Sequence, residues 1–236
     1  MVPRRWWYRA ALAASRMQGR LTEMRGGNRT LTEAVMLDNW LWELTKIGPF
    51  PIPWTVEGTE LIERDPQVGT MFCWVHEPLA EFPPRPYMEL GFGEPVVVAH
   101  PGRIVGNSEM LVAGMERRLV AIPSNGYALG RAMRTLKQGT SMMCLVNDQL
   151  CSEISPLIFR LVQKLGGRLV FQQAKRQPDG TIHVRFMKAP RPMCESDEAI
   201  EENVAYLQEI QRQVLAELGA GTVVIQETAR LAKSRA

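Results

Sequence analysis

An α/β fold is predicted for this chain: a single layered α/β domain with a largely parallel central sheet flanked by helices and preceded by N-terminal helices. From Gly69 onward, short apolar runs bounded by glycine or proline alternate with segments whose apolar residues recur at helical spacing. Upstream of Gly69, two helical patterns precede a proline-rich stretch. We therefore expect an N-terminal helical region over residues 1–68, with a membrane-interface helix, and an α/β domain over residues 69–236.

The composition is that of a globular protein with a sizeable core, because 45% of the 236 residues are apolar and 22% are charged. The net charge of +3 is too small to indicate a nucleic-acid partner. No apolar stretch approaches the roughly 20 residues that span a bilayer, and Arg9 and Arg16 interrupt the apolar part of the N-terminus. We therefore expect a cytoplasmic protein. The four cysteines lack Cys-x-x-Cys spacing, which favours reduced thiols over a disulfide or a zinc site.

Residues 3–20 form the first helical pattern, and it is strongly basic: the first 29 residues hold seven arginines and one acid, Glu23. Arginine beside tryptophan and tyrosine suits an interfacial helix on an anionic membrane, while a terminal helix packed on the domain is the alternative. The first interpretation places the protein peripherally on the inner face of the cytoplasmic membrane. The apolar positions of the pattern are Trp6, Trp7, Ala10, Ala14 and Met17.

The other elements follow in order. Thr30 and Glu33 form a capping-box signature for a helix over residues 31–46, and three prolines keep residues 48–54 extended. Expected strands span residues 70–75, 95–99, 119–122, 141–146, 168–174 and 181–188, with 223–225 as an edge strand. Expected helices run from residue 107 or 108 to 115, and over 127–137, 156–165 and 196–218. A helical turn begins at Pro78 and ends at Pro83 and Pro84.

Polar residues stand at the ends of four expected strands: His76, His100, Ser124 and Asp148. Ligand sites of open α/β sheets lie beyond the carboxyl ends of the strands. We therefore expect the functional site at this edge of the sheet.

His76 is the candidate general base, and Glu81 is the carboxylate that orients its ring. The two side chains meet only if His76 lies in the corner before the helical turn. An imidazole held by a carboxylate is suited to removing a hydroxyl proton. His100 has no acid at the same spacing, and His183 lies on the polar face of an alternating strand. The sequence contains no nucleophile elbow, no P-loop and no plausible set of metal ligands.

Residues 69–218 resemble the lysophospholipid acyltransferase superfamily, most closely its bacterial lipid A biosynthesis (lauroyl/myristoyl) acyltransferase branch. The segment from His76 to Glu81 looks like that branch's motif of a histidine, four residues and an acid at the end of a strand. Residues 129–139 resemble its short helix followed by Lys-x-Gly. Asp148 and Gln149 look like the Asp-Gln that follows its next strand.

The resemblance implies transfer of a fatty acyl group from a thioester of acyl carrier protein or coenzyme A to a lipid hydroxyl, with no bound cofactor or metal. His76 would take the hydroxyl proton and Glu81 would fix the tautomer of the ring. Arg117 and Arg118 stand where the family places a basic residue for an anionic headgroup, which arginine binds in bidentate fashion. The candidate substrate-binding residues are Arg117, Arg118, Asp148, Gln149 and Ser124.

Three interpretations of function remain open at this point. The first is the acyltransferase, with a basic helix face that docks an acidic carrier protein or is merely solvated. The second is a non-catalytic protein that binds lipids or acyl chains on the same fold. The third is a hydrolase of thioesters or lipids in which His76 activates water. The basic face consists of Arg131, Arg134 and Lys137.

Overall fold

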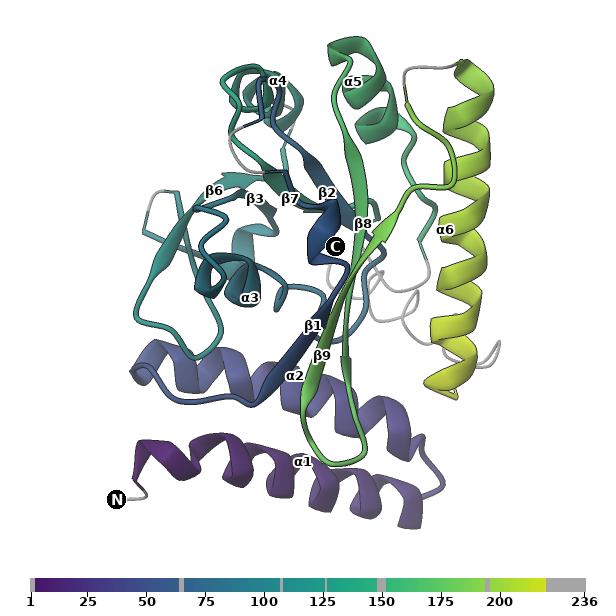
Figure 1. Cartoon of the computed structure of the whole chain (residues 1–236). Helices are drawn as coiled ribbons and strands as arrows, with labels where there is room; N and C mark the ends of the chain where they lie inside the picture. Colours follow the sequence, from purple (N-terminus) through teal and green to yellow (C-terminus); the bar gives the residue numbers. More distant parts are fainter. Residues whose placement is uncertain are drawn as a thin grey trace.

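The computed structural model describes residues 3–63, 66–106, 108–125, 127–147, 152–193 and 196–219, and within them it forms a nine-stranded sheet in the order β1-β9-β8-β2-β7-β3-β6-β5-β4 (Figure 1). The strands are β1 (Trp54–Glu57), β2 (Met71–Trp74), β3 (Val96–Ala99), β4 (Ile104–Val105), β5 (Glu109–Leu111), β6 (Arg118–Pro123), β7 (Met142–Leu145), β8 (Leu169–Arg176) and β9 (Ile182–Lys188). Five of the eight pairings in this described part are parallel. The predicted fold class, an α/β domain with a largely parallel sheet, is therefore confirmed.

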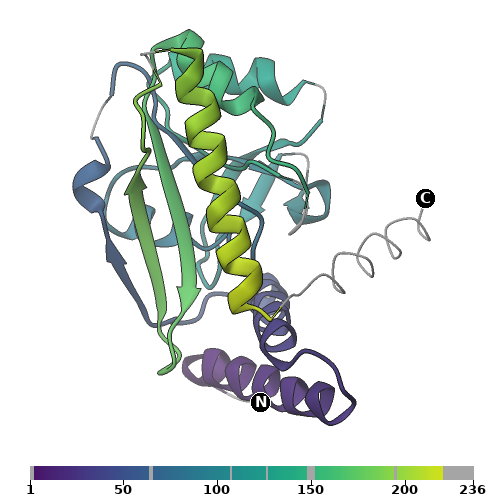
Figure 2. The same ribbon diagram turned by 90° about the vertical axis from the view of Figure 1, so that its right-hand side faces the viewer.

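Helices cover both faces of the sheet (Figures 1 and 2). The α-helices are α1 (Trp7–Met24), α2 (Arg29–Ile47), α3 (Pro84–Glu89), α4 (Ala128–Lys137), α5 (Leu157–Leu165) and α6 (Asp197–Glu217), with short 3₁₀ turns η1 (Arg4–Trp6), η2 (Thr59–Leu61) and η3 (Pro101–Arg103). One apolar layer packs α1, α2 and α3 against the sheet, and a second packs α4, α5 and α6 against the opposite face. Within β2, Phe72 enters the first layer while Met71 and Cys73 enter the second, as the alternation of a strand requires.

The six strands expected between residues 70 and 188 are all present, within two residues at each end. The helices expected over 127–137, 156–165 and 196–218 are present as α4, α5 and α6. These segments carry continuous apolar runs or regular apolar spacing, which are the strongest signals a single sequence offers. The edge strand expected over residues 223–225 lies outside the described residues.

The predicted basic helix forms as η1 and α1, and α1 lies beside α2 at the end of the sheet where β8 turns into β9 (Figures 1 and 2). The hydroxyl of Tyr8 donates to the carbonyl oxygen of Gly180 in that turn. No helix in the described ranges is long and apolar enough to cross a membrane.

The buried face of α1 differs from the tryptophan-containing face that the sequence suggested. Trp6 and Met17 remain 42% and 60% exposed. The reason is steric, because residues of small volume let α2 approach closely, and a Cβ at Gly19 would lie 2.4 Å from Cγ of Glu33. The buried residues of α1 are Tyr8, Ala11, Leu12, Ser15 and Gly19.

The predicted capping box at the start of α2 is wrong. The cap is Asn28, whose Oδ1 accepts a backbone N–H of the first turn at 3.0 Å, and Thr30 has no such role. Glu33 turns inward, where it pairs with Arg29 at 2.8 Å and with Arg176 of β8 at 3.2 Å. Partners that are distant in sequence therefore decide the orientation of Glu33.

Two further local predictions are wrong. Residues 108–115 hold strand β5 in place of the expected helix, because β5 pairs with β6 and buries Met110 between the exposed Glu109 and the half-buried Leu111. Asn107 lies outside the described residues. Pro83 and Pro84 do not end a helix; Pro84 begins α3, since the fixed φ of proline suits the first helical position. The extended stretch over residues 48–54 leads into β1, which pairs with β9 and so adds a strand from before Gly69 to the sheet.

Candidate functional site

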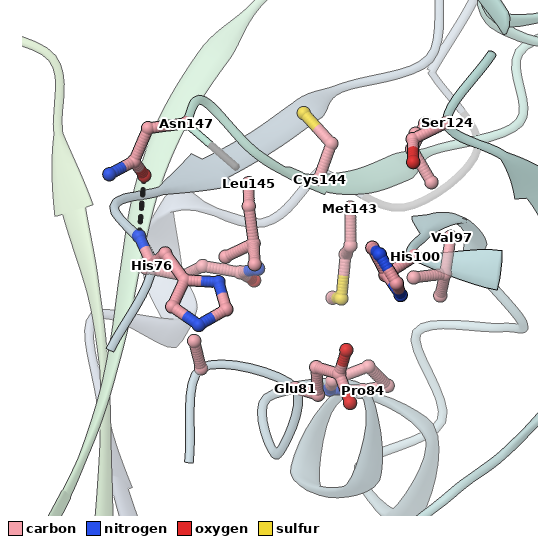
Figure 3. A pocket seen from close by; sticks show the side chains of 13 residues that line it. His76, Glu81, Pro84, Val97, His100, Ser124, Met143, Cys144, Leu145 and Asn147 are labelled. Atoms are coloured by element: carbon pink, nitrogen blue, oxygen red, sulfur yellow. Dashed lines mark hydrogen bonds between the residues drawn. The ribbon is translucent and has the colours of Figure 1, made fainter. Parts of the chain in front are cut away.

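Four neighbouring parallel strands, β2, β7, β3 and β6, end at the same edge of the sheet. The residues that follow them surround a cavity of about 100 Å³, shown in Figure 3. Its polar lining residues are His76, Glu81, His100, Ser124, Asn147 and Gln172. Apolar side chains of β3 and β7, among them Val97 and Met143, line the rest. The strand-end residues that the sequence singled out within the described ranges thus lie around one cavity.

His76 is held by its backbone as well as by its place after β2. Every residue of β2 is buried, because the strand lies between β7 and β8. The backbone N–H of His76 donates to Oδ1 of Asn147 at 2.6 Å, and Asn147 is itself buried (Figure 3). This bond joins the segment after β2 to the segment after β7 and fixes the start of the turn that follows.

Glu77 is a buried carboxyl group next to His76. Nε1 of Trp74 donates to Oε1 of Glu77, and Nε2 of Gln173 donates to its Oε2 at 3.4 Å. Burial raises the pKa of Glu77 to about 8, more than these two hydrogen bonds lower it. Glu77 is therefore mostly uncharged at neutral pH. Glu77 was not predicted from the sequence, although an acid two positions after a continuous apolar run was a visible signal.

The turn after Glu77 is strained at Leu79, which has a φ of +69°. Residues with a Cβ rarely adopt this left-handed conformation, and it costs on the order of 1–3 kcal/mol. Two contacts hold it: the Leu79 side chain is buried, and its N–H donates to Oδ1 of Asp38 on α2 at 3.3 Å. Helix α2 thus sets the path of the chain between His76 and Glu81.

Glu81 lies in this turn and pairs with Arg103 of η3, whose Nε is 3.2 Å from Oε2 of Glu81. Arg103 also reaches Oδ2 of Asp38 at 2.6 Å and lies over the ring of Trp42, 4.9 Å from its centroid. Burial raises the pKa of Glu81 to about 7; Arg103 opposes this rise, and the charge of Asp38 adds to it. The Glu81 carboxyl group in the cavity wall therefore binds a proton near neutral pH, and so does Glu77, which lies outside this cavity in the preceding turn.

His76 and Glu81 approach the cavity from different sides (Figure 3). Among the hydrogen bonds and ion pairs found between described residues, none joins the Glu81 carboxylate to the His76 ring; the ion pair of Glu81 is with Arg103. The orientation of the His76 ring by Glu81 therefore stays a prediction.

Arg117 and Arg118 lie apart from this cavity. Their side chains are 62% and 57% exposed; Arg117 is 3.9 Å from Glu94, and Arg118 pairs with Glu109 at 2.8 Å. Ser124 lines the cavity, and its backbone N–H donates to the carbonyl oxygen at the end of β3 at 3.1 Å. Asp148 and Gln149 lie outside the described residues, so their roles also stay predictions.

His100 and Gln172 are further members of the cavity wall. Nδ1 of His100 accepts the N–H of Gly102 at 3.1 Å, which leaves Nε2 as the protonated nitrogen of the neutral ring. Gln172 lies on β8 and is 2% exposed. Its burial has no local sign in the sequence, because β8 continues with the polar residues Gln173 and Lys175. Among the residues placed by the structure, no group of three or more His, Cys, Asp or Glu side chains is arranged to hold a metal ion.

Comparison with known proteins gives little further guidance. No protein-family model matches the chain, and no curated protein matches it. Among solved structures, the 1-acyl-sn-glycerophosphate (LPA) acyltransferase PlsC from Thermotoga maritima is similar at 15% identity and a TM-score of 0.43, covering 94% of this chain and 85% of that chain. This degree of likeness assigns no activity to the chain.

Proposed function

We propose that the chain is an acyltransferase that moves a fatty acyl group from an acyl thioester to the hydroxyl of a lipid, with His76 as general base. One observation carries the proposal: His76 stands at the carboxyl edge of the parallel sheet, on the wall of a cavity that also holds Glu81 and Ser124. Support for the acyl substrate comes from the apolar side chains of β3 and β7 in the cavity wall, against which an acyl thioester can pack.

The proposed reaction proceeds without a covalent enzyme intermediate. His76 takes the proton of the lipid hydroxyl while its oxygen attacks the thioester carbonyl carbon. The carbon–sulfur bond then breaks, and His76 returns the proton to the departing thiolate. For Glu81 to stabilise the charged ring, its carboxylate must give up its ion pair with Arg103 and form a hydrogen bond with the His76 imidazole instead.

The test compares His76→Ala with His183→Ala, a histidine of β9 that pairs with Thr55 at 2.9 Å on the surface. Thiol release from acyl thioesters and acyl gain in lipid extracts are measured together, the second by mass spectrometry. We expect His76→Ala to lose about 10²–10⁴-fold in rate, as removal of a general base does, and His183→Ala to remain active. Acylation by the His76→Ala protein at the wild-type rate refutes the assignment.

The same assay identifies the two alternatives. Thiol release without acyl gain in the lipid indicates a hydrolase. Lipid binding by a wild-type protein that releases no thiol from any donor indicates a non-catalytic binding protein.

The lipid acceptor suggests a membrane partner, and we propose that α1 rests on an anionic membrane at the inner face of the cytoplasmic membrane. Support comes from the exposed side of α1, opposite its buried residues, where Met17 and Met24 are 60% and 82% exposed. The Arg9 guanidinium lies 4.9 Å from the centroid of the Trp6 ring, so cations border these apolar side chains. Such a helix face binds anionic bilayers through buried apolar area and charge together.

For the thioester donor we propose an acidic carrier protein that docks on α4. The support is the exposed basic face of α4, Arg131, Arg134 and Lys137, in a stretch of sequence without acids from residue 117 to 147. Reversing these three charges should raise the KM for an acyl carrier protein thioester at least about 10-fold and leave the KM for the coenzyme A thioester nearly unchanged. An equal effect on both donors refutes carrier docking at this face.

A further inference from the structure

Helices α4 and α5 both begin at the edge of the sheet that holds the cavity. Ser124 of the cavity wall precedes Ala128, the first residue of α4, by four positions. The N–H of Ser155, two positions before α5, donates to the carbonyl oxygen of Val146 at 2.9 Å, next to Asn147 in the same wall. The two helices also contact each other. Their first turns are therefore held close to the strand ends around the cavity.

The exposed sides of α4 and α5 face outward together. Both helices lie in one layer on the same face of the sheet and turn their buried residues toward it. They stand at the end of the molecule opposite α1 (Figures 1 and 2). Each exposed side carries a basic stripe, because residues three or four apart share a helix face. The stripe residues are Arg131, Arg134 and Lys137 on α4, and Arg160 and Lys164 on α5.

The stripe cations are not neutralised by the protein itself. No ion pair between residues that the structure describes involves any of them. The sequence has no acid from residue 117 to 147 or from residue 154 to 178. Cations without local counter-charges produce a positive field over both helices, and such a field attracts an acidic partner and speeds its association.

Each basic stripe begins with an exposed apolar side chain at its cavity end. Tyr127 stands four positions before Arg131 and is 82% exposed, and Leu157 stands three positions before Arg160 and is 53% exposed. A single exposed apolar residue is common on protein surfaces. Two such residues in the same position on neighbouring helices, each followed by arginine, resemble a protein-binding surface, in which tyrosine and arginine are enriched.

We infer that α4 and α5 together form one docking surface for the acyl carrier protein, with the stripe cations facing its acidic side and Tyr127 and Leu157 packing beside its thioester. The inference rests on the proposed function and deepens it: α5 joins α4, and the apolar end orients the carrier toward the cavity. An anionic bilayer fits this surface less well. Two apolar side chains offer little area for insertion, and a flat bilayer on α1 does not reach the opposite end of the molecule.

The experiment measures the Kd of the full chain for an acyl carrier protein whose acyl chain is attached by a non-hydrolysable thioether, so that no turnover is needed. Reversing both charges on α5, Arg160→Glu with Lys164→Glu, should raise the Kd at least about 10-fold. Arg20→Glu with Arg25→Glu on and after α1 makes the same change in net charge and should bind as wild type. The thermal midpoint of each variant shows that it is folded, and Arg160→Gln with Lys164→Gln repeats the test by removing the charges only.

The apolar end of the surface is tested separately. Tyr127→Ser with Leu157→Ser should raise the Kd at least about 5-fold, because truncated aromatic and aliphatic contacts at the centre of an interface weaken binding. The control is Ile47→Ser, which removes an apolar side chain at the end of α2 that is 65% exposed. It should bind the carrier as wild type does.

Carrier binding that is unchanged by the α5 substitutions, or weakened equally by those on and after α1, overturns the inference. So does a loss of sedimentation with vesicles of phosphatidylglycerol and phosphatidylcholine at unchanged carrier binding, since the surface would then be a membrane face. Failure of the proposed function appears elsewhere, as wild type that binds the carrier but releases no thiol from its thioester. Absence of carrier binding by wild type overturns the docking surface, while thiol release from coenzyme A thioesters still decides the activity.

Discussion

Glu77→Gln tests, through the pH dependence of stability, whether burial keeps the carboxyl group next to His76 protonated. The pKa of Glu77 is raised from 4.5 to about 8 by burial. Between these values the folded protein holds a proton that the unfolded chain has released. Wild-type stability therefore falls as pH rises through this window, since the folded state binds more protons than the unfolded state.

The magnitude follows from the width of the window. Each pH unit within it costs about 1.4 kcal/mol, so wild type loses on the order of 4 kcal/mol between pH 5 and pH 8 through Glu77. Glutamine keeps an oxygen for the Trp74 N–H and does not titrate. We therefore expect the stability of Glu77→Gln relative to wild type to rise by about this amount over the same range.

The assay is urea unfolding of both proteins at several pH values, with the free energy extrapolated to water. Glu81, whose pKa is also raised, titrates in both proteins and cancels in the difference. Glu43→Gln on α2, an exposed acid paired with Lys46 at 2.7 Å, is the matched control and should show no such trend. Parallel pH profiles for wild type and Glu77→Gln would refute the argument that burial keeps Glu77 protonated.

Three further changes test separate parts of the structure. Asp38→Ala removes the oxygen that accepts the hydrogen bond of the Leu79 N–H at 3.3 Å. We expect thiol release to be roughly 10-fold slower and the free energy of unfolding to fall by about 1 kcal/mol. Turnover equal to that of wild type would show that the turn keeps its conformation without this hydrogen bond. Gly69→Ala places a Cβ 2.0 Å from the Thr140 carbonyl oxygen, so urea unfolding should show a loss of about 2–4 kcal/mol; a loss below about 0.5 kcal/mol contradicts the packing. Met17→Asp should weaken sedimentation with anionic liposomes at unchanged stability, and undiminished sedimentation argues against α1 as the membrane face.

The sheet could be predicted largely from the sequence, because its central strands are continuous apolar runs. Residues 71–74 are all buried, and the short apolar run between Gly69 and Pro78 has the length of a strand and is too short for a helix. The position of the site could also be predicted, because ligand sites of open α/β sheets lie beyond the carboxyl ends of the strands. His76, His100 and Ser124 follow such strand ends, and all three line one cavity.

The errors occur where a residue's environment is made by distant parts of the chain. β5 is only three residues long and exists because β6 lies beside it, so local helix signals at residues 108–115 were misleading. The partner of Glu81 could not be found by spacing, since Arg103 comes from a turn after β3 and is itself oriented by Asp38 and Trp42 of α2. Burial of Glu77 and Gln172 likewise depends on the completed sheet.

The position of β2 in the middle of the sheet has a consequence for folding during synthesis. Met71 pairs with Met142 and with Leu169, so the strand that carries His76 meets its two neighbours 71 and 98 residues later in the chain. At about 5–20 residues per second, the ribosome needs about 5–20 s to supply the second neighbour. For that interval the apolar run of β2 lacks one or both of its neighbouring strands, and it is a natural target for chaperones or for aggregation. The candidate base His76 is thus translated well before the strands that position it. A nascent chain that stops before β8 would contain His76 but would lack one of the two strands that flank β2.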